Sequence, residues 1–400
     1  MATRVEPTLS EVVALVIGGQ AHTRWERYRI DSDLLTPADA WEVSLWATRG
    51  AGEDTILPMR LLPDYVVAGA DVKLLMGGEL VLSGRIDSIE EPLDKTQHGV
   101  HITGRDLGAA LIDCSVPMLA MQNATLATII RRAVQPFGIN QIAYKAKASA
   151  PRQTVHTEPG QTVWDWLLAA CEANQVWPWF KPDGTLVIGE PDYSDQTNAP
   201  AANLVLRMED GTGSAKGNNI KRLHRHTSIH SRFTHFTVLA QGAGTGGEGH
   251  SVSATVKDDD LLVDFPTLYR PKVVLDGNAE NTALATSRAN KLLADSIMAS
   301  ERLHVTVAGH RIRTADGKAG KLWEAGMRVH VLSEPHGVDD VYFVMKRTFE
   351  GGRESGTETH LDLIVDGSWL LNLAKVKGKR KSNTGKKNLK YTNPAAGATP

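Results

Sequence analysis

An alternation of apolar and polar residues with a period of two is the feature that most constrains this chain. In residues 41–46, Trp41, Val43 and Leu45 would lie on one face of a strand, with polar residues between them. The same pattern recurs in residues 81–89, 233–239, 303–307, 328–332, 341–349 and 360–365. A period of two is typical of a strand with one buried face, and glycine, proline or aspartate punctuates most of these segments. The pattern predicts antiparallel β-structure with tight turns rather than regular alternation of strands and helices.

Helical periodicity is confined to a few segments. Residues 125–137 carry six apolar side chains on one stripe, which predicts an amphipathic helix. A second helix is predicted to begin after Thr162, an N-cap candidate, with Asp165 in its first turn. Residues 177–188 follow as a hairpin with an Asp-Gly turn, and residues 279–300 predict a long third helix. We therefore expect two mainly β regions that flank or enclose compact insertions containing helices.

Length and composition indicate a soluble protein of several domains. At roughly 150 residues per domain, 400 residues predict about two to four domains. The chain is 42% hydrophobic and 22% charged, which is ordinary for globular proteins. Residues 12–19 form the longest apolar stretch near the N-terminus, so we expect neither a membrane span nor a secretory signal. Cys114 and Cys171 have no metal-ligand spacing and are expected to be buried apolar residues.

Charge is distributed unevenly along the chain. Eight basic residues and no acidic residue follow Ala374, so residues 1–374 carry a formal charge of −10 although the whole chain carries −2. A segment so poor in apolar residues is predicted to be disordered. Two interpretations stay open with equal weight: a contact with nucleic acid or an acidic protein, or a solubilising terminus. The candidate polyanion or partner contacts are Lys375, Lys377, Lys379, Arg380, Lys381, Lys386 and Lys387.

Two sequence motifs match, in part, the patterns of known binding sites. Residues 242–247 match G-x-G-x-x-G, but no helical pattern follows, so the segment is interpreted as a loop rather than a dinucleotide site. His224 and His226 would share one face of a strand and are weak candidates for metal ligands. Arginine and lysine residues interleave with them and disfavour a divalent cation, so a solvated basic strand edge is the favoured interpretation. No cofactor and no bound metal are expected.

Four tryptophans lie close together in the sequence and could stack sugars or bases. Trp164 and Trp166 are two residues apart on a predicted helix, so we expect one to be buried and the other to lie at a domain or subunit interface. The sequence contains no G-x-S-x-G and no H-E-x-x-H motif. We therefore predict no catalytic residues and no enzymatic activity.

The order of these features resembles the baseplate hub proteins of contractile-tailed bacteriophages, the group that includes Mu-like tail hub proteins and phage late control D proteins. The most specific part is residues 158–165 followed by the aromatic strand and D-G-T-L hairpin of residues 177–188. Residues 264–271, which lead into an alanine-rich helix, and residues 320–331, which precede two strands, are similar to the family in the same order. An opening of the family type covers residues 13–25. Together these segments extend the resemblance over nearly the whole chain, up to about Leu373.

The resemblance implies a mainly β fold with α+β insertions, in which two similar antiparallel β-barrels carry two smaller inserted domains, as in the T4-hub-like fold. We expect the first barrel in residues 1–112 and an α+β insert with two helices and a hairpin in residues 113–200. The second barrel is expected in residues 201–240 and 303–373, with an insert containing the long helix in residues 241–302. Residues 374–400 are the basic tail.

The resemblance further implies a late virion structural protein of the tail baseplate. Three copies would form a pseudo-sixfold hub ring that adapts the tail tube to the central spike and lets DNA pass during ejection without sequence-specific binding. Assembly would take place in the cytoplasm of the host bacterium, with the spike, the tail tube and other baseplate proteins as partners. The acidic body suggests an acidic channel lining as a hypothesis. The alternatives are a cell-wall-degrading enzyme of the tail tip and a glycan- or polyanion-binding module.

Overall fold

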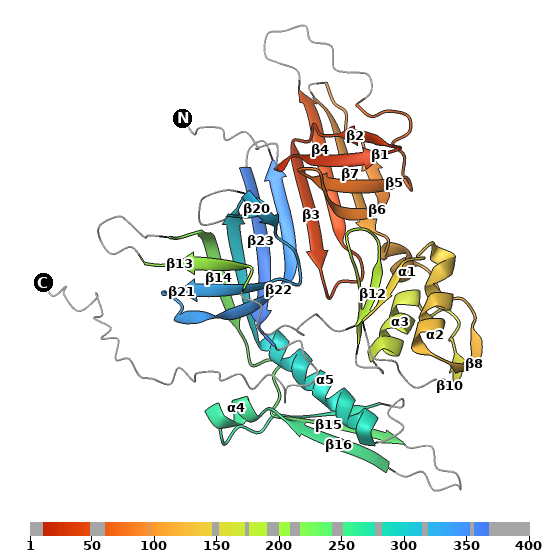
Figure 1. Ribbon diagram of the computed structural model, residues 1–400, viewed down its shortest axis with the longest axis vertical. Helices are drawn as coiled ribbons and strands as arrows, with labels where there is room; N and C mark the ends of the chain where they lie inside the picture. The colour runs from red at the N-terminus through yellow and green to blue at the C-terminus, as the bar shows by residue number, and fades with distance from the viewer. Residues whose placement is uncertain are drawn as a thin grey trace, which may run out of the picture.

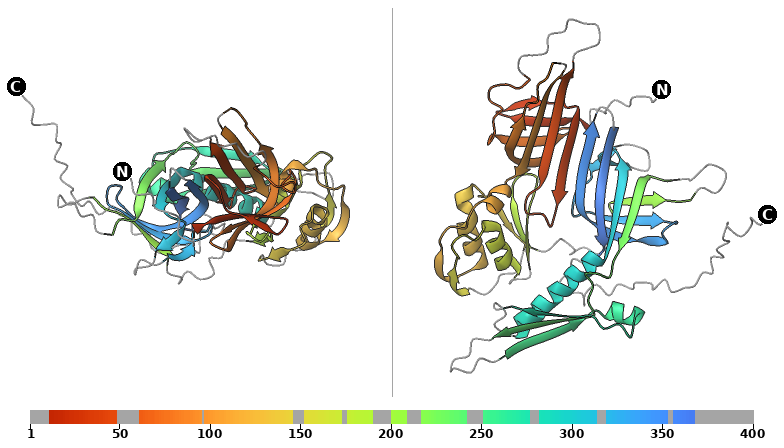
Figure 2. Two further views of the ribbon diagram at one scale, coloured as in Figure 1. Left: turned by 90° about the horizontal axis from the view of Figure 1, so that it is seen from above. Right: turned by 180° about the vertical axis from the view of Figure 1, so that it is seen from behind.

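A computed structural model describes the chain in eleven segments. These are residues 11–48, 61–95, 97–145, 152–172, 176–189, 200–208, 217–241, 251–276, 282–313, 319–352 and 356–367. Strands predominate and helices are few, so the expected mainly β class is confirmed. The long strands stand side by side in the upper part of the molecule, and two smaller units lie below them (Figure 1; Figure 2, right).

The elements fall into four groups along the chain. The first comprises β1 (Val13–Ile17), β2 (Gln20–His22), β3 (Arg27–Asp33), β4 (Ala40–Thr48), β5 (Asp71–Met76), β6 (Glu79–Glu90) and β7 (Gln97–Asp106). The second comprises α1 (Ala109–Asp113), β8 (Ala120–Ala124), α2 (Leu126–Val134), the 3-10 helix η2 (Gln135–Phe137), β9 (Ile142–Tyr144), β10 (Arg152–His156), α3 (Val163–Glu172), β11 (Trp177–Phe180) and β12 (Leu186–Gly189).

The other two groups are interleaved in sequence. The third comprises β13 (Ala202–Leu206), β14 (Ile220–Thr227), β18 (Glu301–Ala308), β19 (Arg311–Arg313), β20 (Ala319–Leu322), β21 (Arg328–Ser333), β22 (Val338–Gly352) and β23 (Gly356–Val365). The fourth lies between β14 and β18 and comprises β15 (His235–Gln241), β16 (Ser251–Lys257), α4 (Asp259–Asp264), β17 (Pro271–Leu275) and α5 (Thr282–Ser300).

One sheet of 13 strands joins the first and third groups. Its order is β14-β18-β23-β22-β3-β4-β7-β6-β5-β1-β2, with β21 paired to β22 and β13 to β21. The two groups meet where β22 pairs antiparallel with β3, from Lys346 opposite Asp33 to Gly352 opposite Arg27. Among the described residues the ladders leave this sheet open, and the two closed barrels implied by the resemblance are not confirmed.

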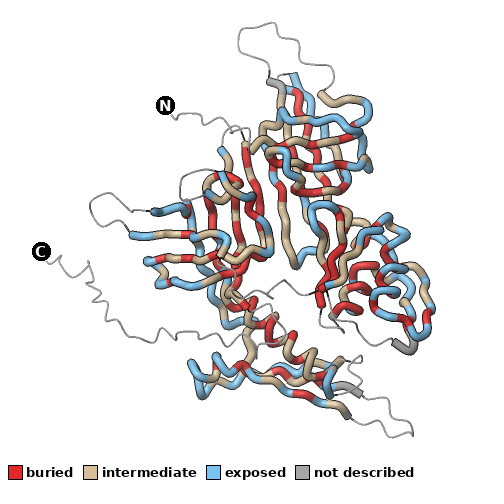
Figure 3. Tube along the Cα trace, viewed as in Figure 1, coloured by how far each residue is buried: buried red, intermediate tan, exposed pale blue. Residues whose placement is uncertain are grey.

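A single apolar cluster runs behind this sheet across both groups. Its members include Leu15, Ile30 and Trp41 from the first group and Phe349 and Leu361 from the third. Figure 3 shows the corresponding buried stretches along the long strands. Because the sheet continues through the β3–β22 junction, the apolar faces of the two groups merge into one core instead of closing separately.

The second group is a compact α+β unit with its own core. Thr125 caps α2 through a hydrogen bond from the Thr128 N–H, and Thr162 caps α3 through a bond from the Asp165 N–H. The apolar stripes of both helices are buried against each other and against β12. The hairpin β11–β12 turns at Gly184, whose φ of 82° belongs to the left-handed region that glycine tolerates. The predicted helices and hairpin of this unit are confirmed.

The fourth group is a three-stranded sheet covered on one face by α5. The strand predicted in residues 233–239 forms as β15, but it pairs with β16 and β17 and lies outside the large sheet. The expected assignment of all of residues 201–240 to the second barrel is therefore wrong for the part from His235 onward. The alternating pattern correctly predicts a strand, but it does not identify the strands that pair with it. These strands lie in residues 251–275.

Candidate functional site

The long strands present one continuous polar face on the side away from the core. Eight strands contribute to it, in the order β14, β18, β23, β22, β3, β4, β7 and the C-terminal part of β6, and we call this surface the polar wall. It arises from the period of two, because the residues between the buried ones must point to the opposite side. Every neighbouring pair in the polar wall is antiparallel.

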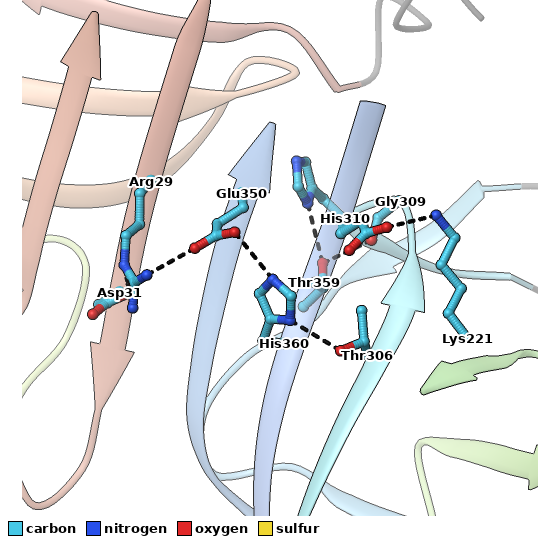
Figure 4. A network of polar contacts seen from close by, with 10 residues as sticks. Arg29, Asp31, Lys221, Thr306, Gly309, His310, Glu350, Thr359 and His360 are labelled. Carbon is cyan, nitrogen blue, oxygen red and sulfur yellow. Dashed lines mark hydrogen bonds and ion pairs between the residues drawn. The ribbon is translucent and has the colours of Figure 1, made fainter. Parts of the chain in front are cut away.

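Side chains from four adjacent strands form a chain of polar contacts on this wall (Figure 4). The Arg29 guanidinium lies 2.7 Å from Glu350 Oε1 and 3.3 Å from Asp31 Oδ1. Glu350 Oε2 lies 3.2 Å from His360 Nε2, and His360 Nδ1 lies 3.0 Å from the Thr306 hydroxyl. The contacts cross the β3–β22 junction, so they tie the two groups together on the polar side as the core does on the other.

Opposite charges are paired elsewhere on the polar wall as well. Lys346 Nζ lies 3.2 Å from Asp31 Oδ2, and Lys221 Nζ lies 2.9 Å from Glu358 Oε1. His304 Nδ1 lies 2.5 Å from Asp362 Oδ1. Each of these pairs is partly exposed, so each contributes at most about 1 kcal/mol. Their main effect is to keep the wall hydrophilic while leaving few of its carboxylates unopposed.

His224 and His226 both lie on exposed positions of β14, at one edge of the polar wall. The His224 ring stacks on that of His304 with 5.8 Å between centroids, and Arg302 lies opposite His226. In the described segments, no group of three or more histidine, cysteine or acidic residues is arranged to hold a metal ion. The surroundings fit the favoured interpretation, a basic strand edge.

Several sequence-level candidates fall outside the described residues. The glycine-rich motif at residues 242–247 is one, and the basic residues from Lys375 to Lys387 are the others. The assignment of the tail as a polyanion or partner contact stays a prediction.

A buried network that sequence reasoning did not find links the two groups from the core side. The Tyr28 hydroxyl lies 2.7 Å from His310 Nε2, and His310 Nδ1 lies 3.1 Å from the Thr359 hydroxyl, which donates to the Gly309 carbonyl. Burial, with the nearby charge of Arg347, lowers the pKa of His310 to about 3. The imidazole is therefore neutral, and Tyr28 donates to its Nε2. Each of these side-chain polar atoms has a hydrogen-bond partner inside the core. The arrangement therefore has a structural role.

A second buried polar cluster lies where the β3–β4 loop meets the start of the α+β unit. The guanidinium of Arg347 is buried and stacks 3.9 Å from the centre of the Phe349 ring. Burial lowers its pKa to about 10, against the opposing effects of Asp39 and Asp31. Burial also raises the pKa of Asp39 to about 6 and that of Asp106 to about 8. The sequence signal that could have indicated this cluster is Arg347 itself, an arginine inside the alternating strand segment of residues 341–349.

The tryptophans do not form an open stacking surface. Trp164 and Trp166 are both buried in the core of the α+β unit, so the expectation that only one would be buried is wrong. Helices and strands surround α3 on both sides, and two positions 200° apart can therefore both be inside. Trp177 is buried at the contact with the large sheet and α5, among Met298, Phe343 and other apolar residues.

Four family models match successive parts of the chain. Residues 12–106 match the N-terminal domain of Mu phage baseplate assembly proteins of the GpP-like type. Residues 108–190 match the second domain of gp44-like baseplate hub proteins. Residues 232–293 match the third domain of NMB1110-like tail proteins, and residues 295–368 match a tail protein C-terminal domain.

Relatives of similar length share this organisation. The tail protein from Neisseria meningitidis MC58 is 32% identical, with a TM-score of 0.73 over 90% of this chain and 98% of that chain. The 43 kDa tail protein of prophage MuSo2 from Shewanella oneidensis, at 23% identity, has a TM-score of 0.73 over 90% of this chain and 99% of that chain. The baseplate hub protein gp44 of Escherichia phage Mu is 23% identical over 388 residues, 93% of each chain.

Fold, polar wall and relatives together define a structural protein of the phage tail. The chain belongs to the family of Mu-like baseplate hub and tail proteins. The resemblance read from the sequence is thereby confirmed. Among the helices of the described segments, none has the length and apolar character needed to cross a bilayer.

Proposed function

We propose that three copies of this chain close into a ring that forms the hub of the baseplate. The carrying observation is the polar wall, whose eight strands alternate in direction from β14 at one edge to the C-terminal part of β6, beyond its pairing with β5, at the other. An even number of antiparallel strands leaves two edges that run in opposite directions. A further copy can therefore continue the alternation at either edge, and a closed ring leaves no edge exposed to unwanted pairing.

The strand count supports a pseudo-sixfold ring with an open centre. Each group supplies four wall strands, namely β14, β18, β23 and β22 from one and β3, β4, β7 and β6 from the other. Three copies would then contribute six four-stranded units. At a spacing of about 4.8 Å, the resulting 24 strands span a circumference of about 115 Å, or a backbone diameter of about 37 Å before strand tilt widens it. Such a ring suits an adaptor between a sixfold tail tube and a threefold spike.

The charges at the two edges are complementary. Arg222 and His226 are exposed on β14 and, with Arg302, have no carboxylate partner in the described part of the chain. Glu90 and Glu91 are exposed where β6 ends at the other edge. Opposite potentials on the two edges favour a head-to-tail contact between copies over contacts between like edges.

In this ring the polar wall lines the channel through which DNA passes during ejection. The acidic lining that we expected does not describe this surface, because carboxylates such as Glu350 and Asp31 are paired with cations. Paired charges offer little free cation to DNA phosphates, so the duplex slides without being held. Among the described residues of the wall, unpaired cations lie at the β14 edge, where a neighbouring copy would cover them, and at Arg27, the first residue of β3.

The remaining functional assignments rest on the same arrangement. We divide the chain into two ring units, residues 1–112 and residues 201–227 with 303–373, and two inserted units, residues 113–200 and 228–302. The inserted units lie below the wall and are suited to contact other baseplate proteins (Figure 1). The tail tube and the central spike would contact the two rims of the ring, and assembly would take place in the host cytoplasm.

Light scattering on a sizing column, combined with negative-stain images of the same peak, tests the ring. We expect a mass of about 130 kDa, three times the chain mass of 43.4 kDa, and ring-shaped particles. A protein that stays at the mass of one chain, both alone and when produced together with its spike protein, would overturn the proposal.

A further inference from the structure

The small sheet formed by β16, β15 and β17 leaves one face uncovered, and both of its terminal strands, β16 and β17, lack a further strand partner in the described part of the chain. On the covered face, Val238 and Ala254 pack against Ala285 and Ala289 of α5. On the opposite face, Leu239 and Leu275 are register partners, and Val273 lies opposite Thr237. The side chain of Val273 is 59% exposed and that of Leu275 is 82% exposed. Apolar residues so exposed in one place commonly mark an interaction surface.

The neighbouring residues extend this apolar stripe. Tyr269, just before β17, is 74% exposed, and its ring contacts that of His235 with 5.6 Å between centroids. Phe265 and Val263 at the end of α4 are also exposed. Figure 3 shows the mostly exposed and half-buried character of this lower sheet, in contrast with the buried long strands above it. We call Tyr269, Val273, Leu275 and Leu239 the β17 stripe.

Within the described residues, the outer backbone edge of β17 has no hydrogen-bonded strand beside it. β17 is a terminal strand of its sheet and pairs in parallel with β15. The Asp276 N–H donates to the Leu239 carbonyl at 3.0 Å, and a parallel ladder uses alternate residues, so Asp276 and Val274 direct their groups to β15. Val273 and Leu275 consequently direct their N–H and C=O groups outward. Outward-facing N–H and C=O groups can form main-chain hydrogen bonds with an extended strand, and the exposed apolar side chains beside them can contact alternate side chains of that strand. This edge therefore favours an extended strand over a helix or a small ligand as its binding partner.

The charges near β17 specify the strand further. Lys272 is exposed at the N-terminal end of β17 and Arg270 directly precedes the strand, and neither has a carboxylate partner within the described segments. The Lys272 ammonium lies 4.9 Å from the centre of the Phe233 ring. These cations favour an incoming strand that carries carboxylates and disfavour the basic residues 375–390 of the chain itself.

A second copy of β17 is also disfavoured as the occupant. Two identical edges pair around a twofold axis, which leaves one of three equivalent edges in a threefold ring without a partner or links rings into an open network. This step rests on the proposed ring. We propose that the β17 stripe binds, by strand addition to β17, an extended segment of another protein in which apolar residues alternate with acidic ones.

Hydrogen exchange on the full-length protein, with a synthetic peptide as probe, tests this inference. The probe has nine residues with valine at alternate positions and glutamate between them, and the matched probe has lysine in place of glutamate. We expect the acidic probe to slow exchange of the Val273 and Leu275 amides by about tenfold or more, and the lysine probe to have little effect. Leu275→Lys should abolish the protection, whereas Met118→Lys, at an exposed apolar position of the α+β unit, should leave it unchanged.

Several different results would contradict the proposal, and each points to a different cause. Equal protection by the lysine probe, or protection that survives Leu275→Lys, overturns the proposal. Amides that are already protected without a probe and become exposed when residues 368–400 are removed would identify the tail as the occupant and overturn it too. Protection that disappears on dilution together with a mass above that of one ring would identify a second copy. The mass of the sample separates these results from a failure of the ring itself, because a single-chain mass overturns the ring whatever the probe does.

Discussion

The buried imidazole of His310 makes the stability of the β3–β22 junction depend on pH in a direction that can be worked out. The folded imidazole has a pKa of about 3, because burial disfavours its charged form, whereas the unfolded one titrates near its ordinary value of about 6.5. Between these two values the unfolded chain binds a proton that the folded chain does not. The free energy of unfolding therefore falls as the pH decreases from about 6.5 towards 3.

From pH 7 to pH 4.5 the loss from this one group is about 2.5 kcal/mol, as an order of magnitude. The variant His310→Gln lacks the titratable group, so the stability difference between wild type and variant should shift by about that amount in favour of the variant at pH 4.5. Phe349→Leu is the matched control, because its ring lies 4.6 Å from the His310 ring and carries no titratable group. Its cost should be the same at both pH values.

Hydrogen exchange of the β22 and β23 amides is the appropriate assay, because a chain with several cores need not unfold in a single step. All samples are compared at one protein concentration, since association adds to apparent stability. A difference between wild type and His310→Gln that is unchanged from pH 7 to pH 4.5 would refute the reasoning. It would mean that the folded protein accommodates the protonated imidazole.

Three further predictions follow from the same structure. Trp166→Ala should destabilise the α+β unit by about 3–5 kcal/mol through lost burial and cavity formation, while the mass of the assembly measured by light scattering stays the same; a dissociated assembly with an intact fold would place Trp166 in an interface instead. Asp106 has a pKa raised to about 8 by burial and accepts a hydrogen bond from the Gly108 N–H that an amide oxygen can also accept. Asp106→Asn should therefore unfold at higher urea than wild type near pH 7 and lose that advantage below about pH 4; equal midpoints at both pH values would contradict this. Glu90→Lys and Arg222→Glu should each weaken the ring in sedimentation, and the double variant should restore it, unless the two edges do not meet.

Local structure was the most predictable level. Residues 41–46 and five of the other six alternating segments lie wholly in strands, and residues 233–239 form a strand from His235 onward. The reason is that a strand at the surface of a core must present apolar and polar side chains to opposite sides. The N-cap at Thr162 formed as predicted, and Thr125 caps α2 in the same way, since a side-chain oxygen at the N-cap satisfies backbone groups within three residues. These rules involve only neighbours along the chain.

One strand shows how a local irregularity defeats the pattern. β22 contains a bulge between Val344 and Lys346 in its pairing with β23, and the extra residue reverses which side chains face the core. Val344 before the bulge and Phe349 after it share the main core, while Met345 packs at the contact with Trp177. The apolar pattern of a single strand does not predict such a register shift.

The sequence by itself determined the β class, the helices and hairpin of the α+β unit, the basic tail and, through its resemblance to a known family, the kind of protein. Only the tertiary structure decided that β3 pairs with β22, that β15 belongs to the small sheet, and that Asp39, Asp106 and Arg347 share one buried site. The physical reason is the range of the interactions. Periodicity, capping and turn preferences act within a few residues, whereas strand partners and buried charges are set by backbone pairing and desolvation between residues far apart in the chain.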